Sequence, residues 1–461
     1  MLHPKRWVAR TGESATLLMT LVILGLGFVL VTAAGNLRAG RPLDTSLLPA
    51  LLPPLVTGLT LLGLHMLLLW RGVAVEQVLL PAVAVIFALG LIIIWRLRGD
   101  EGAWQQITRG WLPGALLSAV LIARPRWMEH IRKSAVWISG VGLFLTALTA
   151  LFGAVDETGA RLALKLGPLP AIQTSEILKV SLIIFLAWYI DREGAAAEGR
   201  AITLFGRLRL PAVRYFMPGA LFVGMASLAL VRMSDYGAVL ILGLLFVAML
   251  YAGFETRTFL TVAAIGAGFA VLASLVIATT WELPATIQNR YLAFMNPWSS
   301  APLLINGQPT GLTIAEGPGY QIQQAVYAII AGGVTGAGLG FGVPQFVPLA
   351  HSDFIFAAIL EEMGGGIGLA ILTLYGVILL RLFRIAILLP HNQVFERLLL
   401  TGIGVHFFAQ VLVMVGGTLN LMPLTGVTLP FLSLGGMAVL VNLLEVGLAL
   451  ALAQRLEVRP L

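Results

Sequence analysis

The chain contains no cysteine, so a disulfide framework, a thiolate metal site and a cysteine nucleophile are all excluded. Its 6 histidines are scattered and form no HExxH motif or comparable cluster, which argues against a zinc site. Charged residues make up only 11% of the 461 residues, whereas soluble domains carry about 25%. Because 58% of the residues are hydrophobic, the chain cannot be a water-soluble globule.

The hydrophobic residues gather in apolar runs of about 20 residues, the length that a helix needs to cross roughly 30 Å of hydrocarbon. The runs predict an all-α polytopic membrane protein with about twelve transmembrane helices. We place these helices at residues 14–34, 46–70, 77–95, 110–123, 135–153, 175–190, 214–231, 237–253, 259–280, 354–380, 398–419 and 430–453.

The basic residues predict the orientation of these spans. A basic segment, MLHPKRWVAR, precedes the first span, and no small-residue cleavage site follows it, so we expect a retained helix. Most of the 29 Lys and Arg residues lie in loops on the same side as the N-terminus, which predicts that both termini are cytoplasmic. These loops also account for the net charge of +7 without a nucleic-acid partner.

With this orientation the largest outer segment runs from about residue 281 to 353. It is rich in Gly and Pro, and loops of this length are usually functional or disordered. Apolar stretches such as QAVYAII argue against disorder. We therefore expect short helices, partly re-entrant or interfacial, that pack over the outer ends of the spans.

The stretch PQFVPLAHSDFIFAAILEEMG, residues 344–364, places Asp353 at the start of a long apolar run, with His351 and Ser352 beside it. Ionisable groups at membrane boundaries are costly, so a function is the first interpretation. The alternative is that Ser352 or Asp353 is an ordinary helix N-cap. Position alone does not separate the two.

Four other polar residues of the spans invite structural interpretations. On a continuous helix, Glu361 and Glu362 would lie roughly 12–14 Å deeper than Asp353, too far to touch the same atom. We interpret at least one of them as a buried structural acid. His406 and Gln410 are one helical turn apart, and for them an interhelical hydrogen bond is favoured over catalysis.

Six sequence blocks, in order, carry a resemblance to a known family. They are TGARLALKLGPLPAIQTSEILKV, VRMSDYGAVLIL, NRYLAFMNPW, GYQIQQAVYAIIAGGVTGAGLGFG, VPLAHSDFIFAAILEEMG and LMPLTGVTLPFLSLGGM. Over residues 77–455 the chain resembles the SEDS family of shape, elongation, division and sporulation proteins. It departs from the family pattern in four places: the usual Trp is missing from residues 162–164, Thr174 stands in place of Pro, Asn296 in place of Asp and Leu349 in place of Glu.

The resemblance implies a domain organisation. Residues 77–461 would form the ten-helix core of the family, with its large, partly helical extracytoplasmic loop at about 281–353. Residues 1–76, with the first two spans, would be an N-terminal extension. In the last block, Ser433 with Gly435 and Gly436 predicts close helix packing.

The resemblance also implies an activity. Family members are peptidoglycan glycosyltransferases that polymerise lipid II on the outer face of the cytoplasmic membrane, for elongation or division, and release undecaprenyl pyrophosphate. The configuration at the donor sugar inverts. Asp353 matches the essential acid of the family, and we expect it to act as the catalytic base. The expected partner is a class B penicillin-binding protein, with membrane lipids around both.

The leaving pyrophosphate needs cations, from side chains or from a divalent ion such as Mg²⁺ or Mn²⁺, although no residue is assigned as a metal ligand. Lys179 and Arg290 are the candidates, and Arg232 is a weaker one. Lys179→Ala and Arg290→Ala should weaken turnover and leave the fold intact. Glu176 and Lys179 could equally be a helical ion pair, and Asp235 an N-cap. The complete set of predicted substrate-binding residues is Lys179, Arg290, Glu176, Asp235, His351 and Ser352.

Two other functions are compatible with the sequence. A flippase or transporter of lipid-linked precursors also has many spans and few intramembrane charges. Against it, the informative residues gather on one side, and we find no inverted repeat. A non-catalytic scaffold for a penicillin-binding protein is the other alternative, which the changes at Leu349 and Asn296 leave open. Polymerisation of lipid II by the purified protein separates these alternatives.

Overall fold

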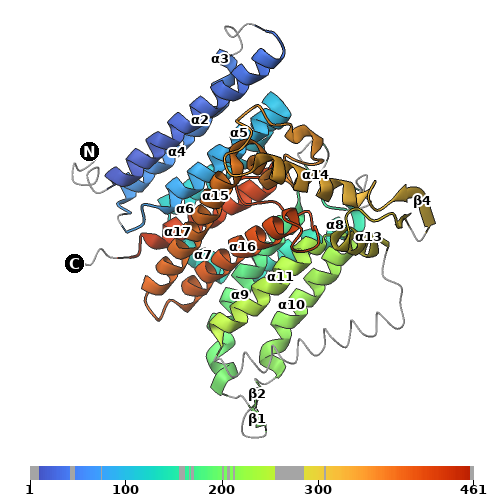
Figure 1. Cartoon of the computed structure of the whole chain (residues 1–461). Helices are drawn as coiled ribbons and strands as arrows, with labels where there is room; N and C mark the ends of the chain where they lie inside the picture. The colour runs from blue at the N-terminus through green and yellow to red at the C-terminus, as the bar shows by residue number, and fades with distance from the viewer. Residues whose placement is uncertain are drawn as a thin grey trace.

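A computed structural model describes residues 10–41, 47–73, 75–154, 161–165, 167, 171–199, 202–204, 208–210, 213–254, 285–305 and 308–456. Helices dominate this part of the chain (Figure 1). The helices are α2 (Thr11–Arg38), α3 (Leu47–Ala50), α4 (Leu52–Arg71), α5 (Leu79–Gln106), η1 (Ile107–Trp111), α6 (Leu112–Ala123), α7 (Trp127–Lys133), α8 (Ala135–Phe152), α9 (Thr174–Gly199), α10 (Val213–Arg232), α11 (Tyr236–Gly253), α13 (Ala285–Met295), α14 (Pro318–Gly332), η2 (Pro344–Phe346), α15 (Ile355–Leu388), α16 (Val394–Thr418) and α17 (Gly436–Ala453). The strands form two hairpins, β1 (Ile202–Leu204) with β2 (Leu208–Leu210) and β3 (Pro302–Ile305) with β4 (Gln308–Thr313).

Within the described residues, 8 helical segments are long and apolar enough to cross a membrane. The predicted spans at 175–190 and 214–231 are helical as well, in α9 and α10. The predicted span at 259–280 lies outside the described residues. The chain is therefore an all-α polytopic membrane protein, as the sequence predicts.

The segment Leu79–Ala123 reverses direction at Gly99, whose φ of 58° and ψ of −148° are not helical. Phe87 and Trp111 stack with their ring centroids 3.9 Å apart. A straight helix would separate these two residues by about 36 Å. Residues 79–98 and 100–123 are therefore two antiparallel arms, which confirms the predicted spans at 77–95 and 110–123.

α15 also reverses, at Gly364, whose φ is 81° and ψ is 169°. A Cβ on Gly368 would lie 2.3 Å from Leu360 Cδ2 and 3.4 Å from Phe356 Cζ. A straight helix would place Phe356 about 18 Å from Gly368. Residues 355–363 therefore form a returning arm that lies against the rest of α15. The prediction of one continuous span at 354–380 was wrong in this respect, because only the part after Gly364 crosses the bundle.

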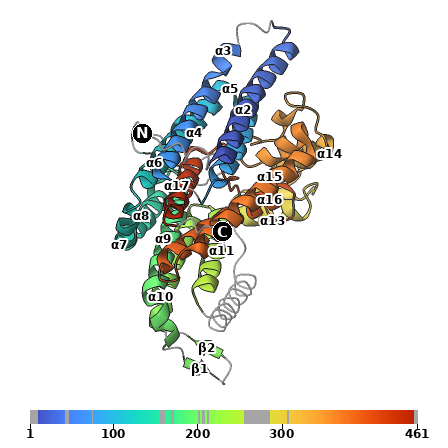
Figure 2. The same ribbon diagram turned by 90° about the vertical axis from the view of Figure 1, so that its left-hand side faces the viewer.

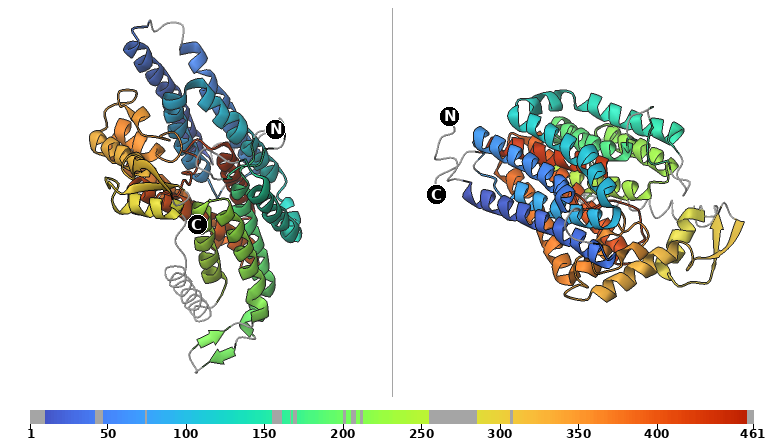
Figure 3. Two further views of the ribbon diagram at one scale, coloured as in Figure 1. Left: turned by 90° about the vertical axis from the view of Figure 1, so that its right-hand side faces the viewer. Right: turned by 90° about the horizontal axis from the view of Figure 1, so that it is seen from above.

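The two ends of the bundle differ. Gln454 at the end of α17 bonds to the carbonyl of Ile122 at 2.9 Å, and Arg71 Nε lies 3.4 Å from Gln454 Oε1. This termini end holds the first described residues of α2 and the last of α17 (Figures 1 and 2). The opposite end holds α13, α14 and the β3–β4 hairpin, which project to one side of the bundle (Figure 3).

The described part of the segment between α13 and α15 is folded and packed, as the sequence predicts. Gln323 Nε2 of α14 donates to the carbonyl of Pro297 at 2.8 Å, and Trp298 Nε1 lies 3.2 Å from the Tyr327 hydroxyl. α14 packs against the returning arm of α15, where a Cβ on Gly332 would lie 2.0 Å from the carbonyl of Leu360. From the sequence we expected only short helices in this segment and did not predict the β3–β4 hairpin.

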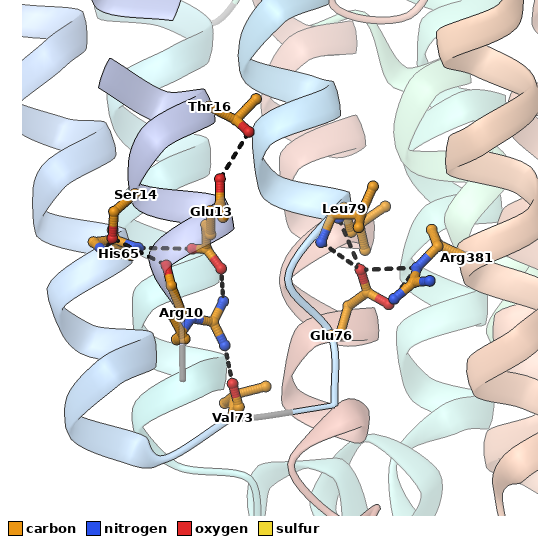
Figure 4. Close-up of polar contacts among 11 residues, drawn as sticks. Arg10, Glu13, Ser14, Thr16, His65, Val73, Glu76, Leu79 and Arg381 are labelled. Carbon is orange, nitrogen blue, oxygen red and sulfur yellow. Dashed lines mark hydrogen bonds and ion pairs between the residues drawn. The ribbon is translucent and has the colours of Figure 1, made fainter. Parts of the chain in front are cut away.

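The first two helices, α2 and α4, are fastened to the rest of the bundle. At the termini end, Arg10 contacts Glu13 and the carbonyl of Val73, and His65 Nδ1 lies 2.8 Å from Glu13 Oε1 (Figure 4). Arg10, Glu13 and His65 are each at most 3% exposed. This buried polar cluster links α2 to α4 and to the segment that leads into α5.

Glu76 joins the start of α5 to α15 at the same end (Figure 4). Its Oε1 accepts hydrogen bonds from the backbone N–H of Val78 at 2.9 Å and of Leu79 at 2.8 Å. Its Oε2 lies 2.9 Å from Arg381 Nε. Glu76 thus satisfies two N–H groups at a helix start while it neutralises a cation on α15.

Candidate active site

Asp353 lies on the turn between η2 and the returning arm of α15. Leu349 begins this turn with a φ of 54°, a left-handed conformation. Its carbonyl accepts hydrogen bonds from the backbone N–H of Ser352 at 3.0 Å and of Phe354 at 3.2 Å. Phe354 is fully buried, whereas Asp353 is partly exposed. The turn is therefore anchored through the buried Phe354, whereas Asp353 beside it keeps part of its surface exposed.

Three consecutive carbonyls of this turn are held by one distant part of the chain. Leu434 N–H donates to the carbonyl of His351 at 2.9 Å, and Ser433 Oγ donates to that of Ser352 at 2.7 Å. Thr418 Oγ1, at the end of α16, lies 3.5 Å from the carbonyl of Asp353. We call residues 419–435 the closing loop. Sequence reasoning assigned Ser433 to close packing and missed this hydrogen bond.

The closing loop lies inside the bundle. Gln106 donates to the carbonyl of Ser433 at 2.8 Å and accepts from Gly435 N–H at 2.9 Å. A Cβ on Gly90 would lie 2.4 Å from the carbonyl of Leu432. Gly90 lies within the first arm of α5. The closing loop that holds Asp353 therefore extends from the end of the bundle with the β3–β4 hairpin, which we call the β3–β4 end, into the bundle.

Glu361 and Glu362 lie toward the β3–β4 end, on the far part of the returning arm. Glu362 Oε1 pairs with Arg96 Nε at 3.1 Å, about 9 Å along α5 from Gly90 toward the β3–β4 end. Both acids are buried, at 3% and 1% exposure, which confirms their structural role. The expectation that they lie deeper than Asp353 was wrong, because it assumed a helix without the reversal at Gly364.

The carboxylate of Asp353 faces the closing loop and the start of α11. Its Oδ2 lies 3.5 Å from where a Cβ would stand on Gly426, which has a φ of 73°. On the other side of this loop, a Cβ on Gly237 would lie 2.4 Å from Val427 Cγ2. Glycine at 426 and 237 thus lets α11, the closing loop and Asp353 approach one another.

Arg290 of α13 brings a positive charge to the same place. Its guanidinium carbon lies 5.8 Å from the ring centroid of Tyr236, the first residue of α11. Burial raises the pKa of Asp353, while a hydrogen bond from Ser352 and the charge of Arg290 lower it in part. The structure therefore brings together Asp353, Ser352 and Arg290 from the predicted set.

His351 is half-buried beside this carboxylate. Burial lowers its pKa, and the positive charge of Arg98 lowers it further. The imidazole is therefore neutral at pH 7, so it adds no charge next to Asp353. Arg98, an exposed residue at the end of the first arm of α5, was not among the predicted site residues.

Asp235 caps α11, as the alternative interpretation holds. Its Oδ1 accepts a hydrogen bond from Ala238 N–H at 3.0 Å, and the residue is 9% exposed. Arg232, the last residue of α10, is exposed. A role of either residue in binding substrate stays a prediction.

Glu176 and Lys179 belong to a second polar cluster, in the interior of the bundle. Lys179 Nζ pairs with Glu176 Oε1 at 2.8 Å, and the two residues are 2% and 4% exposed. His406 Nδ1 lies 2.8 Å from Glu445 Oε1 of α17, which confirms an interhelical hydrogen bond for His406. No hydrogen bond or ion pair among the described residues connects this interior cluster to Asp353.

The described residues include no group of three or more His, Asp or Glu side chains positioned to hold a metal ion. We derive no catalytic step through one.

The family described as cell cycle protein, named for FtsW, RodA and SpoVE, matches residues 76–457. The chain belongs to this SEDS family. A probable peptidoglycan glycosyltransferase FtsW from Thiomicrospira cyclica is 34% identical over 345 residues, which are 73% of this chain and 78% of that protein. The peptidoglycan glycosyltransferase RodA of Mycobacterium bovis is 30% identical over 380 residues, 80% of this chain and 75% of that one.

Solved structures of the SEDS family have a similar fold. A chain from a peptidoglycan synthase complex, studied for its coordination of polymerization and crosslinking, matches with a TM-score of 0.63 and 27% identity. The match covers 82% of this chain and 97% of that one. The crystal structure of RodA from Thermus thermophilus matches with a TM-score of 0.54 and 25% identity, over 82% and 96% of the two chains.

Two departures from the SEDS pattern leave the local backbone hydrogen bonds in place. Asn296 Oδ1 accepts a hydrogen bond from Trp298 N–H at 3.1 Å, as an aspartate oxygen would. The side chain of Leu349 is 46% exposed, and it is the backbone of this residue that shapes the Asp353 turn. Neither change removes a contact that holds the turn.

Proposed function

We propose that the protein polymerises lipid II into glycan strands, with Asp353 as the catalytic base. The observation that carries the proposal is the Asp353 turn, in which three successive carbonyls are hydrogen-bonded and the carboxylate lies within the field of the Arg290 cation. A base held in this way needs little reorganisation at the moment of proton transfer. The chain's membership of the SEDS family, whose relatives include peptidoglycan glycosyltransferases, supports the same reaction.

The proposed chemistry is one inverting displacement. Asp353 takes the proton from the C4 hydroxyl of the acceptor sugar, and the freed oxygen attacks C1 of the donor sugar. The bond from C1 to the phosphate oxygen breaks, and its electron pair leaves with undecaprenyl pyrophosphate. The raised pKa makes Asp353 a stronger base than an exposed carboxylate. Arg290 would stabilise the negative charge that develops on the pyrophosphate.

The remaining predicted substrate residues have different support. His351 and Ser352 share the turn with Asp353, so we propose that they contact the sugars. Asp235 stands beside Tyr236, whose ring Arg290 covers, and it would shape the floor of the site. Glu176 and Lys179 are buried in the interior cluster, and binding of the pyrophosphate there would require the substrate to enter the bundle.

Arg290 allows a test by pH. Since its charge lowers the pKa of Asp353, Arg290→Ala should raise that pKa, so the base stays protonated up to a higher pH. We expect the acid limb of the polymerisation profile to move to higher pH, with a lower maximal rate. Arg290→Lys should keep the limb near its wild-type position. An Arg290→Ala profile that coincides with the wild-type profile would remove Arg290 from the site.

The simplest test of the function itself uses purified protein. Polymerisation of lipid II in the absence of any other glycosyltransferase is the expected result. A flippase would move lipid II across a vesicle without joining it, and a scaffold would act only with a partner enzyme. We propose a class B penicillin-binding protein as the partner, supported by the resemblance to a chain from a peptidoglycan synthase complex.

We propose that both termini face the cytoplasm and that the Asp353 turn opens to the outside, with residues 1–76 as an extension of a core at 77–461. The support is the distribution of Lys and Arg, together with the shared end of α2 and α17. Reporter fusions should place residue 390, beyond α15, inside. A reporter at residue 390 that is active only outside the cell would overturn this topology.

A further inference from the structure

α2 lies outside the part of the chain that matches the SEDS family, which begins at residue 76. It is nevertheless packed along α5: the rings of Phe28 and Trp95 are 4.9 Å apart, and Trp95 Nε1 lies 3.2 Å from Thr32 Oγ1. The buried cluster around Arg10 and Glu13 fastens its other end. α2 is therefore fastened at its first residues (Figure 4) and packed along α5 further on (Figure 2).

The C-terminal end of α2 contacts a glycine-rich segment, residues 333–343, which we call the glycine loop. Arg38, in the last turn of α2, donates to the carbonyl of Phe341 at 2.5 Å and to that of Gly342 at 3.3 Å. Its guanidinium carbon lies 5.6 Å from the ring centroid of Phe341. One side chain of α2 thus makes three contacts with the loop.

The backbones of the two elements also approach closely. A Cβ on Gly340, which has a φ of 83°, would lie 2.7 Å from Ala34 Cβ. Ala34 is 3% exposed, so the loop covers it. A larger side chain at 34 would have to push the glycine loop away.

The opposite side of the glycine loop rests on the returning arm of α15. Val343 N–H donates to Glu361 Oε1 at 2.7 Å, and Gly340 N–H donates to Glu362 Oε2 at 3.0 Å. Arg96 of α5 pairs with Glu362 and also donates to the carbonyl of Gly342 at 3.2 Å. The loop is therefore clamped between α2 and the arm that starts directly after the Asp353 turn.

We infer that α2 is a strut that positions the glycine loop, and through it the returning arm and the Asp353 turn. The catalytic segment would then depend on a helix that the matched family region does not include. Its effect on polymerisation rests on the function proposed above, whereas its effect on the loop does not. Arg38 and Ala34 are positioning residues in this scheme, since neither lies at the reacting atoms.

The test uses the full-length protein and two variants with matched controls. Arg38→Ala removes the three contacts, and Arg41→Ala, an exposed arginine just beyond α2, is its control. Ala34→Leu inserts a wedge against Gly340, and Ala33→Leu, a neighbour on the same helix that is only partly buried, is the second control. Amide hydrogen exchange of peptides covering 333–349 reports on the loop without any assay of activity.

We expect exchange in 333–349 to rise about three- to tenfold in Arg38→Ala and Ala34→Leu, and to be unchanged in both controls. The two variants should also polymerise lipid II more slowly, with kcat lowered by a similar factor and KM nearly constant. Unchanged exchange in both variants would overturn the inference, as would faster exchange with wild-type kcat. If the wild-type protein itself makes no polymer, the proposed function fails while the exchange result still decides whether α2 holds the loop.

Discussion

Asp353→Asn should reduce polymerisation of lipid II by about 10²–10⁴-fold, with normal expression and a normal complex with the proposed partner transpeptidase. Asparagine keeps the size of the side chain and can still cap a helix, but it cannot take a proton from the acceptor hydroxyl. The backbone bonds of the turn, to Leu434, Ser433 and Thr418, involve carbonyls and not this carboxylate, so the variant should retain the fold. Asp353→Ala should behave in the same way.

The asparagine variant separates the two interpretations of the residue. A residue that acts only as a cap predicts nearly normal activity with asparagine and a modest loss of stability with alanine. Thermal unfolding of both variants, measured beside the polymerisation assay, distinguishes a dead enzyme from an unfolded one. An Asp353→Asn protein that keeps most of its activity on lipid II would end the catalytic assignment.

Lys179→Ala should be damaging for a different reason. It leaves Glu176 charged and without its partner in the interior of the bundle, where removal of one member of an ion pair costs on the order of 3–5 kcal/mol. We expect a large fall in the unfolding temperature together with a loss of polymerisation. The structure thus adds a stability cost to a variant that sequence reasoning expected to fold normally. Lys165→Ala, which changes an exposed lysine, is the matched control.

A double variant separates structure from substrate binding at this pair. Glu176→Leu with Lys179→Met replaces the ion pair by apolar side chains and should recover much of the unfolding temperature. If Lys179 binds the pyrophosphate, the double variant stays inactive although it is folded. Wild-type rates in the stable double variant would assign the pair to the fold alone.

The helices could be predicted from the sequence because apolar runs of membrane-crossing length are a strong signal. The reversal at Gly99 was predictable as well, since Arg96, Arg98, Asp100 and Glu101 interrupt the apolar run around it. The reversal at Gly364 was not. Three glycines, Gly364 to Gly366, stand there in an otherwise apolar stretch, and hydropathy alone cannot distinguish a bend from a straight helix.

The residues of the candidate site could be predicted from the sequence, but the hydrogen bonds that position them could not. Asp353 stood out because a carboxylate at the edge of an apolar run is costly. The polar support of its turn could not be found in this way, since Ser433 and Thr418 bond to backbone carbonyls that are far away in the sequence. Likewise Glu361 and Glu362 are recognisable as buried acids, but the backbone N–H groups that they accept from became visible only with the fold.

The hydrogen bonds that hold the Asp353 turn have a consequence for the order of biosynthesis. Their donors, Thr418, Ser433 and Leu434, are synthesised after Asp353 and after α15, Thr418 being the last residue of α16. Chains emerge from the ribosome N-terminal part first. Asp353 therefore lacks these three hydrogen bonds until α15, α16 and the closing loop have been translated. A nascent or truncated chain that ends before residue 418 therefore contains Asp353 but none of the three hydrogen bonds that hold its turn.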